Sequence, residues 1–564
     1  METDSEVDDY GGSWGSRQIS RRQFLGGLGG VTAGVALSST MGGFPVQAQT
    51  RAKLLGKKSS TGWAKAPVSF VFLDSTEPSG LDPSLQNQFD SYHILRNVYD
   101  TLTWGNDAPS TPVLEPRLAT SWKSNASGLE WTFQLRPHVK FVDGTPLDAD
   151  AVVLSMKRHI AIGAPGLYGY TLDGIANVAA TGPMSVTFTT QAPQPWLPYH
   201  MLYFAIMSPK AINDHKTATD PWAETFFGQN CVGTGAYKLS SWTHGVKITM
   251  VKNREWWNGP WKPGSIDHVT VQWESNPSTA AELIQSGGAN FSTEWSVDSA
   301  ITVGAMEGFS LHKYLVYHID PVIAFNQSKP PFQIKEVRQA FQYAFDYAAM
   351  RKYYRGYAQP TTGVIPAFSP YALKGLPEYK QNLPKAKALL AKANIDPSTL
   401  TLTCFSAGGY PDLIAGGTVL ASSLAKIGVK VNDQVLPFGS LEAAMGQASS
   451  AAPLTSSLYG GSASFDPTAF LSSYLPTSVV QIFEHWNSAQ LVTAYNEASS
   501  SSNPAKLKAG LDNAQRLIND DAPVILGAIP EVLVVIPDYL EGFVLQTTDA
   551  VYPCLFYTMR LHEH

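Results

Sequence analysis

Short β-branched and aromatic runs alternate with helical stretches along most of the chain, and no sequence repeat connects them. This alternation is typical of α/β lobes around mixed sheets, because helices cover the apolar faces of the strands. A run such as Val68-Ser69-Phe70-Val71-Phe72-Leu73 predicts a buried strand. We expect strands over residues 68–73, 130–135, 185–189, 247–252, 268–273 and 400–405, and helices over residues 89–99, 149–159, 279–285, 334–354, 383–393, 417–427, 489–499 and 504–520.

The stretch 334–354 shows the helical pattern most regularly. Val337, Ala340, Phe341, Ala344 and Phe345 recur at intervals of three and four residues, with polar residues between them. Such a stripe predicts one helix that packs against a core through a single face. We assign it no ligand role.

The length of the chain requires more than one folding unit. It has 564 residues, whereas a single hydrophobic core stops growing at about 250–300 residues, so we expect at least two lobes. Hydrophobic residues make up 44% of the chain and charged residues 15%, which excludes a disordered or fibrous protein. The net charge of −6, without a long basic block, argues against nucleic acid as a partner.

The first 48 residues have the pattern of a twin-arginine export signal. Ser20-Arg21-Arg22-Gln23-Phe24-Leu25 opens a mildly hydrophobic, glycine-rich run that ends near Val46-Gln47-Ala48. We expect cleavage after Ala48, with retention as an uncleaved anchor as the alternative. No cysteine follows the run to carry a lipid, so a free periplasmic protein is predicted. The basic, polar residues 49–66 predict a flexible arm.

The three cysteines, Cys231, Cys404 and Cys554, match no zinc or redox spacing. We expect buried or free thiols, and one disulfide remains open because sequence cannot choose a pair. Beyond Ala48 no nucleophile elbow, zinc-binding His-Glu-x-x-His helix or phosphate loop occurs. We therefore predict no catalytic residues, no metal site and no cofactor.

A set of separated motifs occurs in a defined order along the chain. They are Leu81-Asp82-Pro83, Val98-Tyr99-Asp100-Thr101-Leu102, Pro116-Arg117-Leu118-Ala119, the block 122–152 with Asp143-Gly144-Thr145-Pro146, Gly233-Thr234-Gly235-Ala236-Tyr237, Trp256-Trp257, Phe325-Asn326-Gln327-Ser328 and Asp521-Ala522-Pro523-Val524. Their chemistry is mainly structural: residues 143–146 suit a tight turn, and Asp148 suits a helix cap.

In this order the motifs resemble the extracellular solute-binding proteins of family 5, the oligopeptide, dipeptide and nickel type, over about residues 68–545. The resemblance implies an α/β fold of two hinged lobes with a subdomain inserted in lobe one. Lobe one would comprise residues 67–325, with the subdomain at about 113–230, and residues 530–564 would return to it. Lobe two would comprise 326–529, with crossings near 324–327 and near Pro530.

The resemblance also implies where a solute binds. Ligand contacts in the family come from the loop before Leu-Asp-Pro and from a strand and loop of lobe two that end in Asp-Pro. Exposed strand edges can hold many ligand sequences through backbone hydrogen bonds, and glycines permit close approach. We expect Asp466 to cap the helix after it. The candidate ligand-binding residues are Glu77, Trp295, Asn326, Tyr459, Gly460, Gly461, Ser462, Ala463 and Ser464.

One position departs from the family pattern. Peptide-binding members usually carry an aspartate for the ligand's α-amine where this chain has Ala463. A buried ammonium without its partner would cost roughly 3–5 kcal/mol. A peptide with a free amino end is therefore disfavoured unless another carboxylate, such as Glu77, replaces it.

The function implied by the resemblance is capture of a peptide or peptide-like solute and its delivery to the permease of an ABC importer in the inner membrane. We expect a monomer that does not alter its solute. The alternatives are a receptor for opines, sugars or metal chelates and, less in keeping with the motifs, a hydrolytic enzyme.

Overall fold

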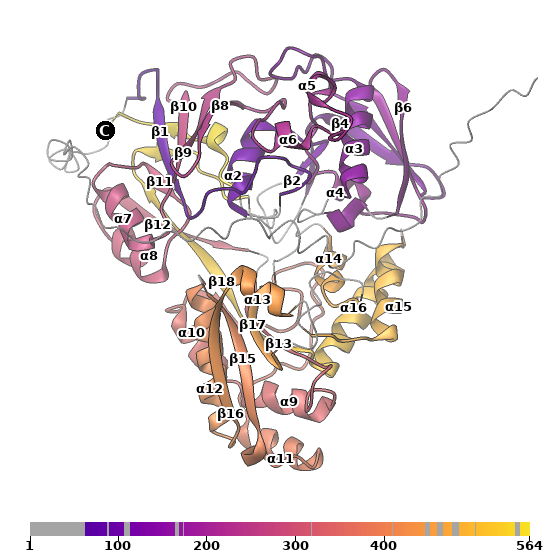
Figure 1. Cartoon of the computed structure of the whole chain (residues 1–564), viewed down its shortest axis with the longest axis vertical. Helices are drawn as coiled ribbons and strands as arrows, with labels where there is room; N and C mark the ends of the chain where they lie inside the picture. Colours follow the sequence, from indigo (N-terminus) through magenta and orange to yellow (C-terminus); the bar gives the residue numbers. More distant parts are fainter. Residues whose placement is uncertain are drawn as a thin grey trace, which may run out of the picture.

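The chain folds into two lobes, which are joined by strands on one side and also touch on the other (Figure 1). The computed structural model describes residues 62–563 except 87–88, 106–112, 164–168, 173, 317–318, 409, 446–451, 460–465, 477–483, 502 and 547–552. The predicted export signal and most of the predicted arm lie outside this part. No helix of the described part is long and apolar enough to cross a membrane.

Lobe one is built on a five-stranded sheet in the order β11-β1-β10-β9-β8. β1 pairs in parallel with β10 and β11, and β9 is antiparallel to both of its neighbours. Buried aromatic residues such as Phe70, Phe72 and Tyr237 fill the core beneath it. The elements are β1 (Ser69–Asp74), α2 (Phe89–Val98), β8 (Tyr237–Thr243), β9 (Lys247–Lys252), β10 (His268–Trp273), α7 (Pro277–Gln285), β11 (Phe291–Ser292) and α8 (Val297–Gly304).

A subdomain is inserted between α2 and β8. Its four-stranded antiparallel sheet, in the order β4-β5-β7-β6, packs against α3 around a separate apolar core. Asp148 caps α3 as expected, with Oδ1 accepting from the amide of Ala151 at 2.8 Å. The elements are β2 (Thr103–Gly105), β3 (Leu114–Pro116), β4 (Ala119–Ser124), β5 (Glu130–Leu135), α3 (Ala149–Ile162), β6 (Ile175–Gly182), β7 (Ser185–Thr190), α4 (Leu197–His200), α5 (Pro209–His215) and α6 (Glu224–Phe227).

Four of the sequence motifs meet at one buried carboxylate. Asp100 accepts from Arg117 Nε at 2.7 Å, from Thr234 Oγ1 at 2.9 Å and from Trp257 Nε1 at 2.8 Å. Gly235 lies against the same segment, where an added Cβ would stand 2.5 Å from the carbonyl carbon of Val98. These motifs therefore fix the scaffold, because each supplies one part of a fully paired buried network.

The Leu-Asp-Pro motif is explained by a second buried ion pair. Asp82 accepts from Arg158 through both guanidinium nitrogens, Nη1 at 2.8 Å and Nη2 at 2.5 Å. Arg158 also donates to Ser84 Oγ at 2.7 Å and to the carbonyl of Trp222 at 2.8 Å. The bidentate pair fastens the loop after β1 to α3, and so joins the main sheet to the inserted subdomain.

Lobe two contains a seven-stranded mixed sheet in the order β12-β18-β13-β17-β15-β16, with β14 added to β18. Helices cover it, and two apolar clusters form its core. The elements are α9 (Lys335–Ala344), α10 (Tyr347–Tyr353), β14 (Ala358–Gln359), α11 (Leu383–Lys392), β15 (Thr401–Gly408), α12 (Pro411–Ala425), β16 (Lys430–Pro437), α13 (Phe438–Met445), β17 (Leu454–Tyr459), α14 (Pro467–Ser472), α15 (Ala489–Ser499) and α16 (Pro504–Asp521).

Two strand connections join the lobes. β12 (Phe309–Leu315) is followed by β13 (Ile319–Phe325), and the long β18 (Val524–Pro537) returns between them. The second half of β18 pairs with β12, and its first half pairs with β13. β13, which contains the first half of the predicted crossing at 324–327, pairs with both β17 and β18. The second crossing, expected near Pro530, and the bounds of the lobes remain predictions.

The predicted helix over 334–354 is two helices. α9 ends at Ala344, and Phe345 takes an extended conformation with φ −62° and ψ 136°. Asp346 then caps α10, with Oδ1 accepting from the amide of Ala349 at 3.0 Å. The prediction was wrong because a capping side chain competes with helix continuation without breaking the apolar spacing.

Two further expectations meet the structure here. All three cysteines are free and buried, which closes the question of a disulfide within the chain. The end of the predicted arm is docked: Trp63 stacks on His562 with ring centroids 4.0 Å apart, and Arg560 lies over the same indole. Trp63 is therefore held against the C-terminal segment, and for the remaining residues the flexible arm remains a prediction.

Candidate functional site between the lobes

Lobe one presents its parallel strand ends toward lobe two, where the loop after β1 leads to α2 (Figure 1). In open α/β sheets, ligands bind outside the carboxyl ends of the strands. Asp74 is the last residue of β1. Glu294 lies two residues after the end of β11, the strand that pairs with β1. Asp90, in the first turn of α2, lies beside them. Three carboxyl groups from separate elements therefore gather at this edge.

Burial and neighbouring carboxyl groups raise the pKa values of Asp74 and Glu294. Asp74 is 1% exposed, and its pKa is raised well above the usual value by burial and by the charges of Asp90 and Glu294. The pKa of Glu294 is raised to about 7 by desolvation and by Asp90. Its side chain is nevertheless exposed, so water screens part of this effect. At neutral pH the cluster of three carboxyl groups therefore retains a proton that three well-separated carboxyl groups would release.

Neutral donors hold these carboxylates in place. Asp74 Oδ1 accepts from the amide of Ser75 at 2.9 Å, and Asp90 Oδ2 accepts from the hydroxyl groups of Ser75 and Thr76. Asp74 Oδ2 is buried without a hydrogen-bond partner. A side-chain hydrogen bond between Asp74 and Asp90 also raises the pKa of Asp74, so these two carboxyl groups share a proton.

A histidine adjoins the cluster but is poorly suited to ligate a metal. One ring nitrogen of His93 lies within 4.8 Å of carboxylate oxygens of Asp74 and Asp90. Burial lowers the pKa of His93 to about 4, so its ring is neutral. Its Nδ1 accepts from the backbone amide of Cys554 at 2.8 Å, which places the single ring proton on Nε2. No lone pair of this tautomer remains for a metal ion.

The lobes touch on the side away from their connecting strands. His200 Nε2 of α4 lies 2.8 Å from Asp466 Oδ2 at the start of α14. Beside this pair the rings of Trp196 and Tyr371 meet edge to face, with centroids 6.0 Å apart. Both side chains of the polar pair are largely buried, at 12% and 5% exposed. The structure is therefore a closed arrangement in which the subdomain contacts lobe two directly.

Asp466 serves two elements at once. Its Oδ1 accepts from the amide of Thr468 at 2.8 Å and caps α14, which confirms the expected cap. Its other oxygen faces His200 of the opposite lobe. Sequence reasoning found only the first role, because the second depends on two residues far apart in the chain.

Glu77, the predicted substitute carboxylate, is engaged within lobe one. Oε1 accepts from Trp242 Nε1 at 2.8 Å and lies 3.2 Å from His244 Nδ1, and Oε2 accepts from the amide of Gly245 at 2.8 Å. These bonds tie the loop after β1 to the turn between β8 and β9. In this conformation Glu77 orients that loop.

The remaining predicted residues divide between buried positions and undescribed ones. Asn326 is fully buried, and its Oδ1 accepts from the amide of Ser328 at 3.0 Å. Trp295 is half-buried and donates from Nε1 to the carbonyl of Ser292 at 2.9 Å. Tyr459 ends β17. Gly460, Gly461, Ser462, Ala463 and Ser464 lie outside the described residues, so their contacts remain predictions.

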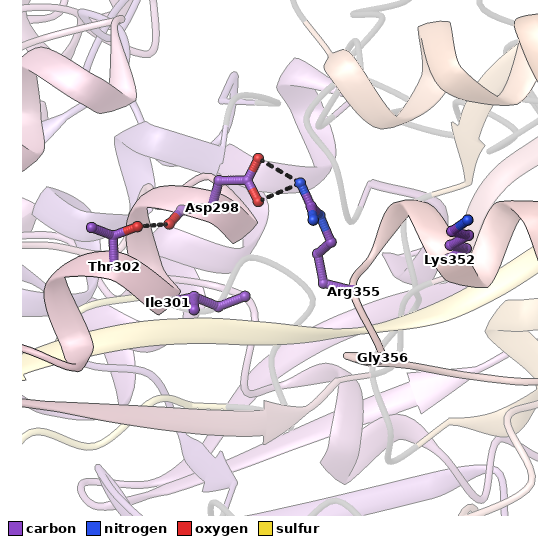
Figure 2. Close-up of a pocket in the computed structure, with 6 residues that line it drawn as sticks. All are labelled: Asp298, Ile301, Thr302, Lys352, Arg355 and Gly356. Atoms are coloured by element: carbon purple, nitrogen blue, oxygen red, sulfur yellow. Dashed lines mark hydrogen bonds and ion pairs between the residues drawn. The ribbon is translucent and has the colours of Figure 1, made fainter.

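A separate cavity of about 520 Å³ lies beside the connecting strands, between α8 and α10. Figure 2 shows Arg355 reaching toward Asp298 across it, at an N–O distance of 3.1 Å. Both side chains are mostly exposed, at 60% and 73%. An open recess of this kind does not enclose a solute, so we regard it as a feature of the region beside the connecting strands. It is lined by Asp298, Ile301, Thr302, Lys352, Arg355 and Gly356.

Comparison with known proteins gives consistent matches. Residues 113–480 match the bacterial extracellular solute-binding proteins, family 5. The chain is 27% identical over 368 residues to the probable D,D-dipeptide-binding periplasmic protein DdpA of Escherichia coli K12, covering 63% of this chain and 68% of that protein. It is 27% identical over 363 residues to the glutathione-binding protein GsiB of the same strain, covering 64% and 68%.

Among solved structures, the fold is similar to the periplasmic binding protein DppA of Helicobacter pylori in complex with the peptide STSA. The TM-score is 0.75 at 23% sequence identity, and the match covers 89% of this chain and 99% of that chain. This likeness confirms the predicted two-lobed α/β fold.

Proposed function

Because the chain belongs to the bacterial extracellular solute-binding proteins of family 5, we propose that it captures a peptide or peptide-like small organic solute between its lobes and delivers it to the permease of an ABC importer. The relatives named above carry peptide-type ligands in their names, D,D-dipeptides and glutathione. On this proposal the protein works as a monomer in the periplasm. It reaches that compartment by the twin-arginine route and releases its solute unaltered.

The observation that supports this proposal most directly is that the lobes are connected by strands on one side and by a polar side-chain contact on the other. One side is held by the strands β12, β13 and β18, and the opposite side by His200 and Asp466. A hinge on one side and a breakable polar contact on the other allow the lobes to open without disturbing either core. Solute bound between them would favour the closed arrangement.

Closure upon binding is measurable. Small-angle scattering of the mature protein should show a smaller radius of gyration when a bound solute is present, and thermal unfolding should shift upward. A solute at one hundred times its Kd stabilises the folded state by about 2.7 kcal/mol. Mass spectrometry of compounds that co-purify with the protein would identify the solute class, with opines, sugars and metal chelates as the non-peptide outcomes.

The proposal fails if a broad panel of small molecules leaves both the scattering profile and the unfolding temperature unchanged. It also fails if any of them is chemically converted, since the proposal requires release of the same molecule that was bound.

A further inference from the structure

We propose that Asp74, Asp90 and Glu294 form an acidic site at the cleft-facing edge of lobe one, and that this site binds an ammonium or guanidinium group of the solute. The proposal rests on the function proposed above, since it assigns one chemical feature of the solute. It places the recognition of positive charge in lobe one.

The geometry provides the first argument. The three carboxyls come from the end of β1, the first turn of α2 and the segment after β11, so each is held by a different element. Asp90 is partly exposed and Glu294 is exposed, which leaves both accessible to solvent. Beneath them Asp74 is 1% exposed, with Oδ2 lacking a hydrogen-bond partner. The hydrogen bond between the side chains of Asp74 and Asp90 requires a shared proton, and a cationic N–H donor can take the place of that proton.

Charge provides the second argument. Burial and the neighbouring carboxyls are the main causes of the raised pKa values of Asp74 and Glu294, and no lysine or arginine contributes to either. The other donors to Asp74 and Asp90 are neutral groups of Ser75 and Thr76, and the two carboxyl groups also share a hydrogen bond. A cation placed among three carboxyls would relieve their repulsion and displace the retained proton. The site is thus electrostatically complementary to a positive group.

The donor chemistry favours an organic cation over a metal ion. Ammonium and guanidinium groups offer several N–H donors and no acceptor, which matches a set of carboxylate oxygens. The neighbouring His93 carries its proton on Nε2, because Nδ1 accepts from Cys554, so it offers no lone pair to complete a metal site. A nitrogen cation needs no such ligand.

The proposal changes what the alanine at position 463 implies. The sequence alone disfavours a peptide with a free amino end, because lobe two lacks the usual carboxylate there. A carboxylate group in lobe one would supply the missing partner. A free amino end, or a basic side chain, then becomes an acceptable part of the solute.

The test uses the mature protein and a matched pair of probes, trialanine and N-acetyl-trialanine, titrated by calorimetry. The variants are Glu294→Gln and Asp90→Asn, which keep the side-chain shape and remove the charge. Glu307→Gln, an exposed residue after α8 in the same lobe, is the control. Calcium and nickel ions are titrated alone as a third arm.

We expect wild type to bind trialanine at least tenfold more tightly than its acetylated form. Each site variant should lose at least tenfold in affinity for trialanine and keep its affinity for N-acetyl-trialanine, and the control should match wild type. Equal binding of both probes by wild type would overturn the proposal. Metal binding that the site variants abolish would overturn it in favour of a metal site.

If neither probe binds, the chemical class of the co-purified solute tests the acidic-site proposal. A solute without a positively charged nitrogen overturns the acidic-site proposal and leaves the transport function intact. A positively charged solute that co-purifies with wild type but not with Glu294→Gln supports both the acidic site and the proposed transport function. If no solute is found and no compound closes the lobes, the proposed function itself has failed.

Discussion

Replacing Asp82 by alanine should destabilise lobe one more than any surface substitution. Arg158 is fully buried, and its guanidinium donates to both oxygens of Asp82, which is itself 1% exposed. Without this carboxylate, a positive charge would remain buried with Ser84, a backbone carbonyl and the thioether sulfur of Met207 as its acceptors. Removal of one partner of a buried ion pair costs about 3–5 kcal/mol.

Two further variants separate the charge from the packing. Arg158→Met combined with Asp82→Ala removes both charges, so it should be less destabilising than the sum of the two single changes. Asp214→Ala is the surface control, since Asp214 and Lys210 form an exposed pair with side chains 50% and 59% exposed. Exposed pairs of this kind contribute about 0–1 kcal/mol.

The tryptophan distribution provides a probe specific to lobe one. Trp486 is the only tryptophan of the chain after residue 326, so intrinsic fluorescence reports mainly on lobe one. Urea unfolding followed by fluorescence should show the lower free energy of unfolding of lobe one in Asp82→Ala. Circular dichroism reports the unfolding of both lobes together. A loss below about 1 kcal/mol, equal to that of Asp214→Ala, would refute the reasoning.

Four other outcomes are expected. His159 is fully buried with its pKa lowered to about 4, so unfolding takes up a proton and up to about 3 kcal/mol of stability should be lost as pH falls from 6.5 to 4; His159→Gln should reduce this loss in urea titrations. Glu294 has a folded pKa of about 7, above its ordinary 4.5, so stability should fall as pH rises through that window, and Glu294→Gln should flatten the decline in Tm. His200→Ala should weaken solute binding by roughly tenfold to a hundredfold, since hydrogen bonds to charged groups contribute about 1.5–3 kcal/mol; unchanged calorimetric affinity would contradict this. Arg21→Lys with Arg22→Lys should leave the precursor in the cytoplasm, as fractionation and immunoblotting would show, and normal export would exclude the twin-arginine route.

Much of the fold was accessible from sequence because local patterns decided it. The strands over 130–135, 247–252 and 268–273 and the helix over 489–499 have the predicted bounds. Of β13 only the end, within the crossing expected at 324–327, was predicted, because a strand buried on both faces shows no alternation of polar and apolar residues. The predicted start of the helix at Gly417 was also late. Gly416 and Gly417 lie inside α12, where an added Cβ at Gly416 would meet Pro321 at 2.4 Å.

The site was less accessible, because it depends on contacts between distant segments. The motifs that carried the family resemblance turned out to fix the scaffold, as Asp100 shows by joining four of them. Asp74 had one usable signal, an acidic residue directly after the first buried strand. Glu294 and His200 had none, since nothing local distinguishes them from other polar residues on loops and helix ends.

The position of β18 has a consequence for how this chain is made. This strand lies inside the lobe-two sheet, between β12 and β13, yet it begins only at Val524. Phe556 and Leu561, farther along, belong to the core of lobe one. A ribosome must therefore finish nearly the whole polypeptide before either half can complete its interior, so the early segments depend on a late strand for their final packing.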